Sequence, residues 1–171
     1  SDYYDMIGIV NQMSPNGLIG SVTESYLSVE DNYNRYFEQK SLREELIKLG
    51  YVNTKLLGIA YYDPKEQKEL IGNFNVRVLD PSYQTISKVV VGAENIIQAM
   101  HTSYLGIRET PVLSVMRRVP FGNKRVLDIY AEIEPDMSVS DRLNKEKWPY
   151  TYMEMDENGI VQYSNNPVIV K

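Results

Sequence analysis

The chain of 171 residues contains no cysteine and only one histidine, His101. The absence of cysteine excludes disulfides, thiolate nucleophiles, iron–sulfur clusters and Cys-ligated zinc. A single histidine likewise excludes metal sites built on a His pair and the H-E-x-x-H zinc helix. Any imidazole chemistry in this chain therefore depends on His101 alone.

Long hydrophobic runs and dense basic runs are also missing. No apolar stretch approaches the ~20 residues that a membrane span requires. The 23 acidic side chains outnumber the 18 basic ones, which gives a formal net charge of -5, so nothing favours binding to nucleic acid. Glycine-rich phosphate loops, the G-x-S-x-G elbow and the EF-hand calcium loop are absent too. We therefore expect no cofactor and no metal.

The composition that remains is that of one globular domain. Apolar residues make up 43% of the chain, and tyrosine occurs 14 times. At this length a single hydrophobic core is the default. We divide the domain into an N-terminal helical arm, residues 1–50, and a sheet-forming part, residues 51–171.

The helical arm is predicted from apolar residues that recur three and four positions apart. They are Tyr3, Met6, Val10, Met13, Leu18, Val22, Tyr26, Val29, Tyr33 and Tyr36. Ser14 and Pro15 are typical of a helix N-cap and a first-turn proline, so we expect one long helix with a break there, ending near Gly50. Its apolar seam either faces the core or forms a coiled-coil dimer contact.

After residue 50 the hydrophobic period changes to two, which is typical of strands. The expected strands are 56–62, 70–78, 112–119, 125–133, 150–155 and 160–164, and the expected helices are 93–104 and 138–146. The predicted fold class is α+β, with a long N-terminal helix packed on an antiparallel sheet of about five or six strands.

No catalytic site is predicted. His101 falls in the expected helix 93–104, and no spacing designates Ser and Asp partners for it. Asp128 and Glu132 share one face of a strand, where carboxylates usually form a solvated surface. Residues 156–159 contain Asn-Gly and are expected to be a hairpin turn rather than a metal site. We therefore expect a domain that is not an enzyme, with a carboxylate hydrolase as an alternative.

Two consecutive arginines, Arg117 and Arg118, lie in the expected strand 112–119. Because side chains alternate along a strand, one of them must point toward a covered face if both faces of the sheet are packed. A covered arginine requires a partner. That partner is either Asp128 on the neighbouring strand or the anionic group of a ligand.

Several other polar or amphipathic side chains occupy the more polar positions of their strands, where they would line a ligand cavity. Together with the two arginines they form the candidate ligand-binding set: Tyr62, Asn75, Arg117, Arg118, Asp128, Tyr130 and Tyr152.

The chain resembles the Cache class of extracytoplasmic PAS-like sensor domains over almost its whole length. The resemblance rests on the long helix, the strand 57–63, Arg117-Arg118-Val119-Pro120, the segment 126–129 and, most specifically, the closing MDENGIVQYSNNP at 155–167. More narrowly, the chain is similar to the ectodomains of Gram-positive membrane sensor histidine kinases. It lacks the Tyr-x-x-x-x-Arg-x-Trp-Tyr signature of amino-acid sensors.

This resemblance implies an extracellular signal-sensing domain of a bacterial two-component histidine kinase. The domain would lie outside the plasma membrane between two membrane helices of a homodimeric parent, with both membrane helices beyond the present sequence. It would bind a small molecule or an extracellular partner and relay a conformational change across the membrane. The alternatives are the sensor domain of a chemoreceptor or cyclase, and a non-enzymatic assembly module that uses the Tyr-rich helix.

Overall fold

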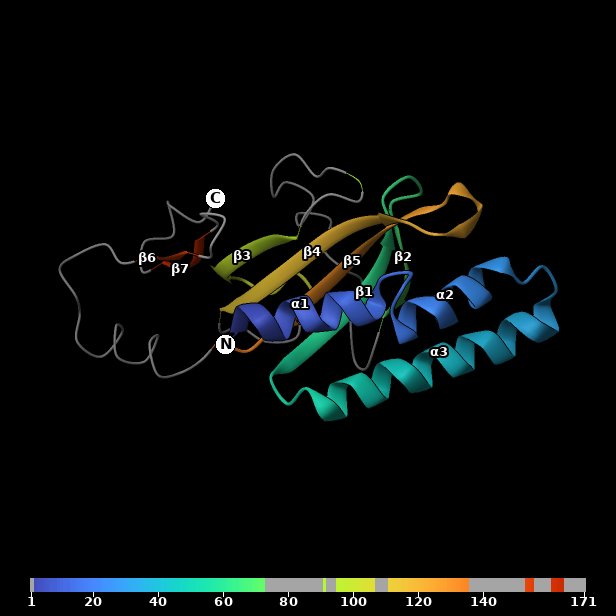
Figure 1. The fold of residues 1–171 in the computed structure, drawn as a ribbon, viewed down its shortest axis with the longest axis horizontal. Coiled ribbons are helices and arrows are strands. Elements are labelled where there is room, and N and C mark those ends of the chain that lie inside the picture. The colour runs from blue at the N-terminus through green and yellow to red at the C-terminus, as the bar shows by residue number, and fades with distance from the viewer. Residues whose placement is uncertain are drawn as a thin grey trace.

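The computed structural model describes residues 2–72, 91, 95–106, 111–135, 153–155 and 161–164. Within these ranges three helices are followed by strands, and the helices lie along one face of an antiparallel sheet (Figure 1). The fold class is therefore α+β, as predicted. No helix in the described part of the chain combines the length and apolarity that a bilayer crossing requires.

The N-terminal helix is bent, as predicted. Its two parts, α1 (Asp2–Met13) and α2 (Leu18–Ser28), are separated at Ser14. The Ser14 backbone N and hydroxyl both donate to the Val10 carbonyl oxygen, at 2.9 and 2.7 Å, and so close the last turn of α1. A Cβ atom on Gly20 would lie 1.7 Å from the Ser14 carbonyl oxygen, so the bend requires glycine at this position.

A second turn separates α2 from α3 (Asn32–Val52). Asp31 caps α3, because its carboxylate accepts bonds from the Asn34 backbone N at 2.8 Å and from the Asn34 side-chain amide at 2.9 Å. α3 runs back beside α2, and the two form an αα-hairpin (Figure 1). The prediction of one helical segment from Leu18 onward is therefore wrong at the turn between α2 and α3, whereas its end near Gly50 is confirmed, because α3 ends at Val52.

The predicted apolar seam divides at this turn. Val22 and Tyr26 in α2 pack against the core. Tyr33 and Tyr36 in α3 are 72% and 63% exposed. The core-facing interpretation thus holds for α2, whereas the tyrosines at the start of α3 face solvent.

The described residues contain one five-stranded sheet. Its strands are β1 (Leu56–Asp63), β2 (Lys68–Gly72), β3 (Ile96–His101), β4 (Val112–Pro120) and β5 (Val126–Ile133). All neighbouring strands are antiparallel, and their order across the sheet is β2-β1-β5-β4-β3. The first and fifth strands therefore pair at its centre.

Two of the predicted hairpins are confirmed. β1 and β2 pair across the polar turn that follows Asp63, and β4 and β5 pair across the turn at Gly122–Lys124. In the second turn, Phe121 N donates to the Arg125 carbonyl oxygen at 2.6 Å. The strand expected at 70–78 is described as far as Gly72, and its remaining residues lie outside the described part.

The helix predicted at 93–104 is wrong, because residues 96–101 form strand β3. Ile96 and Ile97 pair with Met116 and Val115 of β4. The segment contains apolar residues at both helical and strand spacings, and two adjacent β-branched residues favour a strand. Pairing with the edge of β4 decides between these two possibilities.

The last predicted hairpin forms a separate sheet. β6 (Met153–Met155) and β7 (Val161–Ser164) are antiparallel and pair only with each other, while β7 contacts β3. The main sheet therefore consists of five of the described strands, where five or six were expected, and the last hairpin lies outside it. The helix expected at 138–146 lies outside the described residues.

The two faces of the main sheet differ in what covers them. The helices cover the inner face, where the largest hydrophobic cluster joins α1 and α3 to the sheet. It includes Met6, Ile9, Val10, Met13, Leu42, Leu46, Ile59, Tyr61, Val115, Leu127 and Ile129. The opposite, outer face carries a smaller cluster that includes Tyr62, Leu105, Met116 and Tyr130, together with the polar groups considered next.

Candidate functional site

The strand registers place the outer-face side chains in rows across the sheet. The first row contains Tyr62, Asp128 and Arg118, and the second contains Ala60, Tyr130, Met116 and Ile96. A third row contains Gly58, Glu132, Ser114 and Gln98. Four members of the predicted ligand-binding set, Tyr62, Arg118, Asp128 and Tyr130, therefore share this face.

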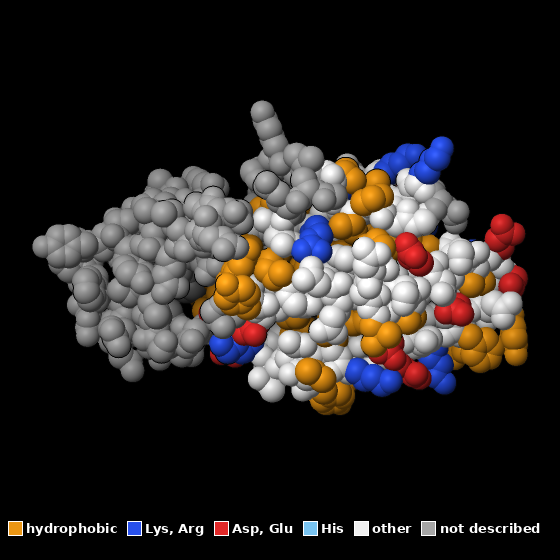
Figure 2. Space-filling model, in the orientation of Figure 1, with side chains coloured by type: hydrophobic (Ala, Val, Ile, Leu, Met, Phe, Trp, Pro, Cys, Tyr) orange, Lys and Arg blue, Asp and Glu red, His pale blue; other side chains and the backbone are white. Residues whose placement is uncertain are grey.

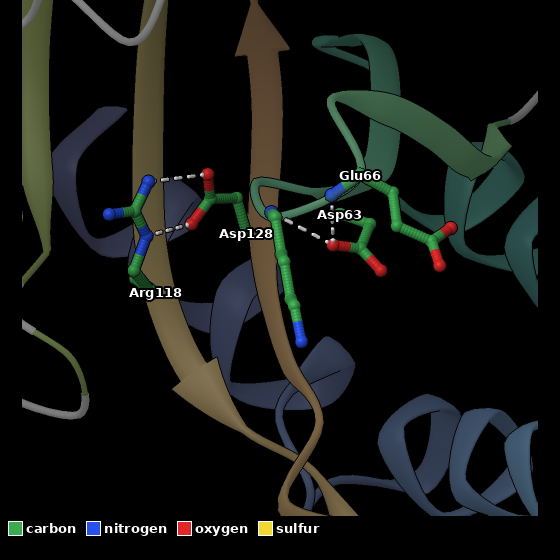
Figure 3. Close-up of polar contacts among 5 residues, drawn as sticks. Asp63, Glu66, Arg118 and Asp128 are labelled. Carbon is green, nitrogen blue, oxygen red and sulfur yellow. Dashed lines mark hydrogen bonds and ion pairs between the residues drawn. The ribbon is translucent and has the colours of Figure 1, made fainter.

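Arg118 and Asp128 form a forked ion pair between β4 and β5. Arg118 Nε donates to Asp128 Oδ1 at 2.7 Å, and Arg118 Nη2 donates to Asp128 Oδ2 at 3.0 Å (Figure 3). The Asp128 side chain is fully buried, whereas the Arg118 side chain is 22% exposed. The arginine on the covered outer face is thus paired with an internal carboxylate, one of the two partners expected.

Tyr62 lies beside this ion pair in the first row and is 2% exposed. Burial raises the pKa of the Tyr62 hydroxyl, and the charges of Asp128 and Asp63 raise it further. The phenol therefore stays protonated and remains a hydrogen-bond donor at neutral pH.

Asp63 ends β1 and organises the turn that follows. Its Oδ1 accepts bonds from Lys65 N at 2.9 Å and Glu66 N at 3.0 Å (Figure 3). Arg125 Nη2 donates to its Oδ2 at 3.2 Å. Burial alone would raise the pKa of Asp63, but these bonds and the Arg125 charge lower it. Asp63 is therefore held as a carboxylate at the same end of the sheet as the Arg118–Asp128 pair.

Glu132 fastens the segment after β3 onto the outer face. Its Oε1 accepts bonds from Tyr104 N at 2.6 Å, Tyr130 Oη at 2.7 Å and Leu105 N at 3.3 Å. Its Oε2 accepts a 2.6 Å bond from Ser103 Oγ. Burial and the Glu132 carboxylate raise the pKa of Tyr130. Glu132 is fully buried, so it is a structural anchor and not part of a solvated face.

His101 lies at the end of β3 and bonds to Ser114 on β4. His101 Nδ1 is 2.7 Å from the Thr102 carbonyl oxygen, which only accepts, so Nδ1 carries the proton. Nε2 is 2.5 Å from Ser114 Oγ and accepts its hydroxyl proton. Burial lowers the pKa of His101 to about 4, although the bond to Thr102 opposes that shift.

This neutral histidine makes stability depend on pH. The folded state keeps His101 neutral down to about pH 4, whereas the unfolded chain binds a proton near pH 6.5. Between these values the unfolded state binds more protons, so stability falls as the pH drops. From pH 7 to pH 5 we expect His101 to account for a loss of about 2 kcal/mol in the free energy of unfolding.

Urea unfolding of the wild type and His101→Gln at several pH values tests this expectation. The free energy of unfolding of the wild type, minus that of the variant, should fall by about 2 kcal/mol from pH 7 to pH 5, since the variant lacks the titrating group. The same pH dependence in both proteins would contradict the assignment.

Arg117 lies on the inner face, apart from the other candidate residues. Its Nε donates to Asn95 Oδ1 at 2.6 Å, and its Nη1 donates to Ser14 Oγ at 3.0 Å. Burial lowers the pKa of the guanidinium, which nonetheless stays charged. Arg117 therefore joins the start of β3 to the bend between α1 and α2.

The remaining two members of the predicted set, Asn75 and Tyr152, lie outside the described residues. In turn, the predicted ligand-binding set did not include Ser114, Glu132 or Tyr104, and Glu132 was considered only as the carboxylate paired with Asp128. Of these, Glu132 had a signal, because it shares a strand face with Asp128 and Tyr130. Two of its donors, Ser103 and Tyr104, come from the segment 93–104, for which the sequence predicts a helix.

The two buried carboxylates of the outer-face rows, Asp128 and Glu132, are engaged in hydrogen bonds within the sheet and the segment after β3. Among the described residues, no three His, Asp or Glu side chains converge as a metal site. The fold and this face define an α+β domain whose antiparallel sheet is packed on both sides. No protein-family model matches the chain, and no curated protein matches it significantly.

Proposed function

We propose that the chain is an extracytoplasmic, PAS-like (Cache) signal-sensing domain of a bacterial membrane-anchored sensor histidine kinase. It binds a small polar molecule or an extracellular partner at the outer face of its sheet. Binding shifts the sheet against the helices, and α1 carries that shift toward the membrane.

The observation that carries this proposal is the polar outer face of a sheet with the order β2-β1-β5-β4-β3. This order, with helices preceding β1, is that of PAS-like sheets. The central strands β1, β5 and β4 hold the row Tyr62, Asp128 and Arg118 on the outer face. Asp128 is already paired with Arg118, but the Arg118 side chain remains 22% exposed, and this accessible guanidinium supports a site for a polar or anionic ligand.

Contacts on the inner face supply a route from the sheet to the helices. Arg117 is adjacent to Arg118 in β4 and bonds to Ser14 at the α1–α2 bend. Tyr61 is adjacent to Tyr62 in β1, and its hydroxyl donates to the Met13 carbonyl oxygen at 2.6 Å. A shift of β1 and β4 caused by a ligand is therefore passed directly to the bend.

A thermal-shift screen of the purified chain against a library of small polar metabolites tests the binding step. A ligand at about 100 times its Kd stabilises the folded state by about 2.7 kcal/mol, which raises Tm by about 5 °C or more. In Tyr62→Phe, which loses only the hydroxyl, the shift at the same concentration should be smaller. Tyr4→Phe is the matched control, because Tyr4 lies on α1 and is 70% exposed.

Two results would count against the proposal. A ligand that gives the same shift in Tyr62→Phe as in the wild type binds elsewhere than the outer face. A library without any stabilising compound argues against a small-molecule signal, and a pull-down with the extracellular proteins of the source organism then tests the partner-protein form.

A further inference from the structure

Helix α3 carries a buried apolar stripe on one side and, on the opposite side, a second stripe with exposed apolar side chains at both ends. Leu42, Leu46 and Leu49 are buried in the core. At about 100° per residue, Tyr33 and Tyr51 lie about 180° from Leu42. They are 72% and 81% exposed. The second stripe therefore faces directly away from the protein.

This exposed stripe has heptad spacing. Its members are Tyr33, Phe37, Lys40, Glu44, Ile47 and Tyr51, and every one is exposed. Their separations alternate between four and three residues, as in a coiled-coil seam, and they span ~27 Å of helix. We call these six residues the α3 seam.

Apolar side chains lie at both ends of the α3 seam, and its two charged residues lie in the middle. Figure 2 shows the same distribution along the edge of the molecule where α3 lies, with hydrophobic groups at its ends and charged groups between them. At one end, the Tyr33 and Phe37 rings make an edge-to-face contact with centroids 4.9 Å apart. Exposed apolar groups arranged along one line are typical of an interaction surface.

The α3 seam is complementary to itself when two copies of the helix run antiparallel. Tyr33 then lies opposite the partner's Tyr51, and Phe37 lies opposite the partner's Ile47. In the middle, Lys40 faces the partner's Glu44, and Glu44 faces the partner's Lys40. A parallel pairing would instead bring Lys40 against Lys40 and Glu44 against Glu44, which is unfavourable.

We propose that α3 is the interface of a symmetric, antiparallel dimer of this chain. Each copy contributes three aromatic rings and one isoleucine, and a fully buried aromatic ring covers ~150–250 Å². The two copies together bury about 1,000 Å², which is at the lower end for specific interfaces. Interfaces of this size are usually weak, so we expect the dimer to form at micromolar or higher concentration, without ligand.

Sedimentation velocity of the purified chain from about 1 to 500 μM tests the dimer. The sedimentation coefficient should rise with concentration in the wild type. Phe37→Ser should weaken association about 100-fold, because the dimer loses two buried rings. Tyr4→Ser removes a ring from α1 that is 70% exposed, against 48% for Phe37, and it should leave association unchanged. A wild type that stays monomeric, or a dimer indifferent to Phe37→Ser, overturns the proposal.

Charge variants test the orientation. Lys40→Glu places like charges opposite each other in the antiparallel dimer and should weaken it about 10-fold. The double variant Lys40→Glu/Glu44→Lys restores the opposite charges and should regain wild-type affinity. In a parallel dimer, Lys40→Glu only exchanges one like-charge pair for another, so an unchanged affinity contradicts the antiparallel arrangement.

Cross-linking gives an independent readout, because the chain has no cysteine of its own. A mixture of Tyr33→Cys and Tyr51→Cys should form a disulfide between the two variants under mild oxidation. Tyr33→Cys alone should not, since the two engineered cysteines would be separated by most of the helix. A disulfide-linked dimer of Tyr33→Cys alone would show parallel helices and overturn the proposed geometry.

Discussion

Arg118→Met is expected to lower the free energy of unfolding by about 4 kcal/mol. The Asp128 carboxylate is fully buried, and the forked arginine supplies two of its hydrogen bonds. Removing the guanidinium leaves a buried negative charge without its counterion, which costs far more than the net value of the ion pair itself. Urea unfolding monitored by circular dichroism measures the loss.

A double variant separates the buried charge from simple packing. Arg118→Met/Asp128→Leu removes both charges and fills their space, so it should recover most of the lost stability. Lys48→Met, which breaks the exposed pair between Lys48 and Glu45, serves as the control and should cost less than about 0.5 kcal/mol. If Arg118→Met lost as little stability as this control, the buried Asp128 carboxylate would not need Arg118 as its counterion.

Glu132→Met is expected to have an effect of similar size, about 4 kcal/mol. The carboxylate accepts bonds from Ser103, Tyr104, Leu105 and Tyr130. Methionine fills a similar volume but accepts none of these bonds, so two backbone amides and two hydroxyls lose their acceptor. The same unfolding experiment measures the effect.

Glu132→Gln is the matched variant. Its amide oxygen still accepts bonds from Tyr104 N and Tyr130, and its NH₂ group donates to Ser103 Oγ, so the expected loss is about 1 kcal/mol. Hydrogen exchange at the Tyr104 and Leu105 amides should accelerate in Glu132→Met much more than in Glu132→Gln. Equal losses in both variants would contradict the anchoring role of Glu132.

Elements with strong local signals were predictable from the sequence. The break at Ser14 follows from the proline after it, and the hairpin of β4 and β5 follows from two alternating segments around a glycine turn. The Arg118–Asp128 pair also followed from alternation, because it required only that β4 and β5 be neighbours. In each case residues close together in sequence determine the outcome.

The features that the sequence did not reveal depend on contacts between distant segments. Residues 96–101 have apolar spacing that suits a helix as well as a strand, and only the free edge of β4 decides in favour of β3. The turn at Asp31 had a local signal, the Asp31–Asn34 cap, but the apolar spacing continued across it. Once β3 replaces the expected helix, His101 reaches Ser114, and the segment after it reaches Glu132.

The antiparallel α3 dimer has a geometric consequence for the proposed sensor. Its two-fold axis is perpendicular to α3. If two copies are anchored in one membrane, their symmetry axis is normal to that membrane, so α3 lies parallel to the membrane surface.

The sensor proposal and the dimer proposal can each fail without the other, because dimerisation is measured without ligand and ligand binding is measured on the outer face.

The central pairing of β1 with β5 also determines when the domain can fold during synthesis. The ribosome makes helices α1 to α3 and β1 well before β5, yet the inner-face cluster requires Leu127 and Ile129 of β5. Until Ile133 has left the exit tunnel, the helices have only part of the surface on which they pack. We therefore expect the nascent chain to remain open and dependent on chaperones through most of its translation, and then to fold late as one unit.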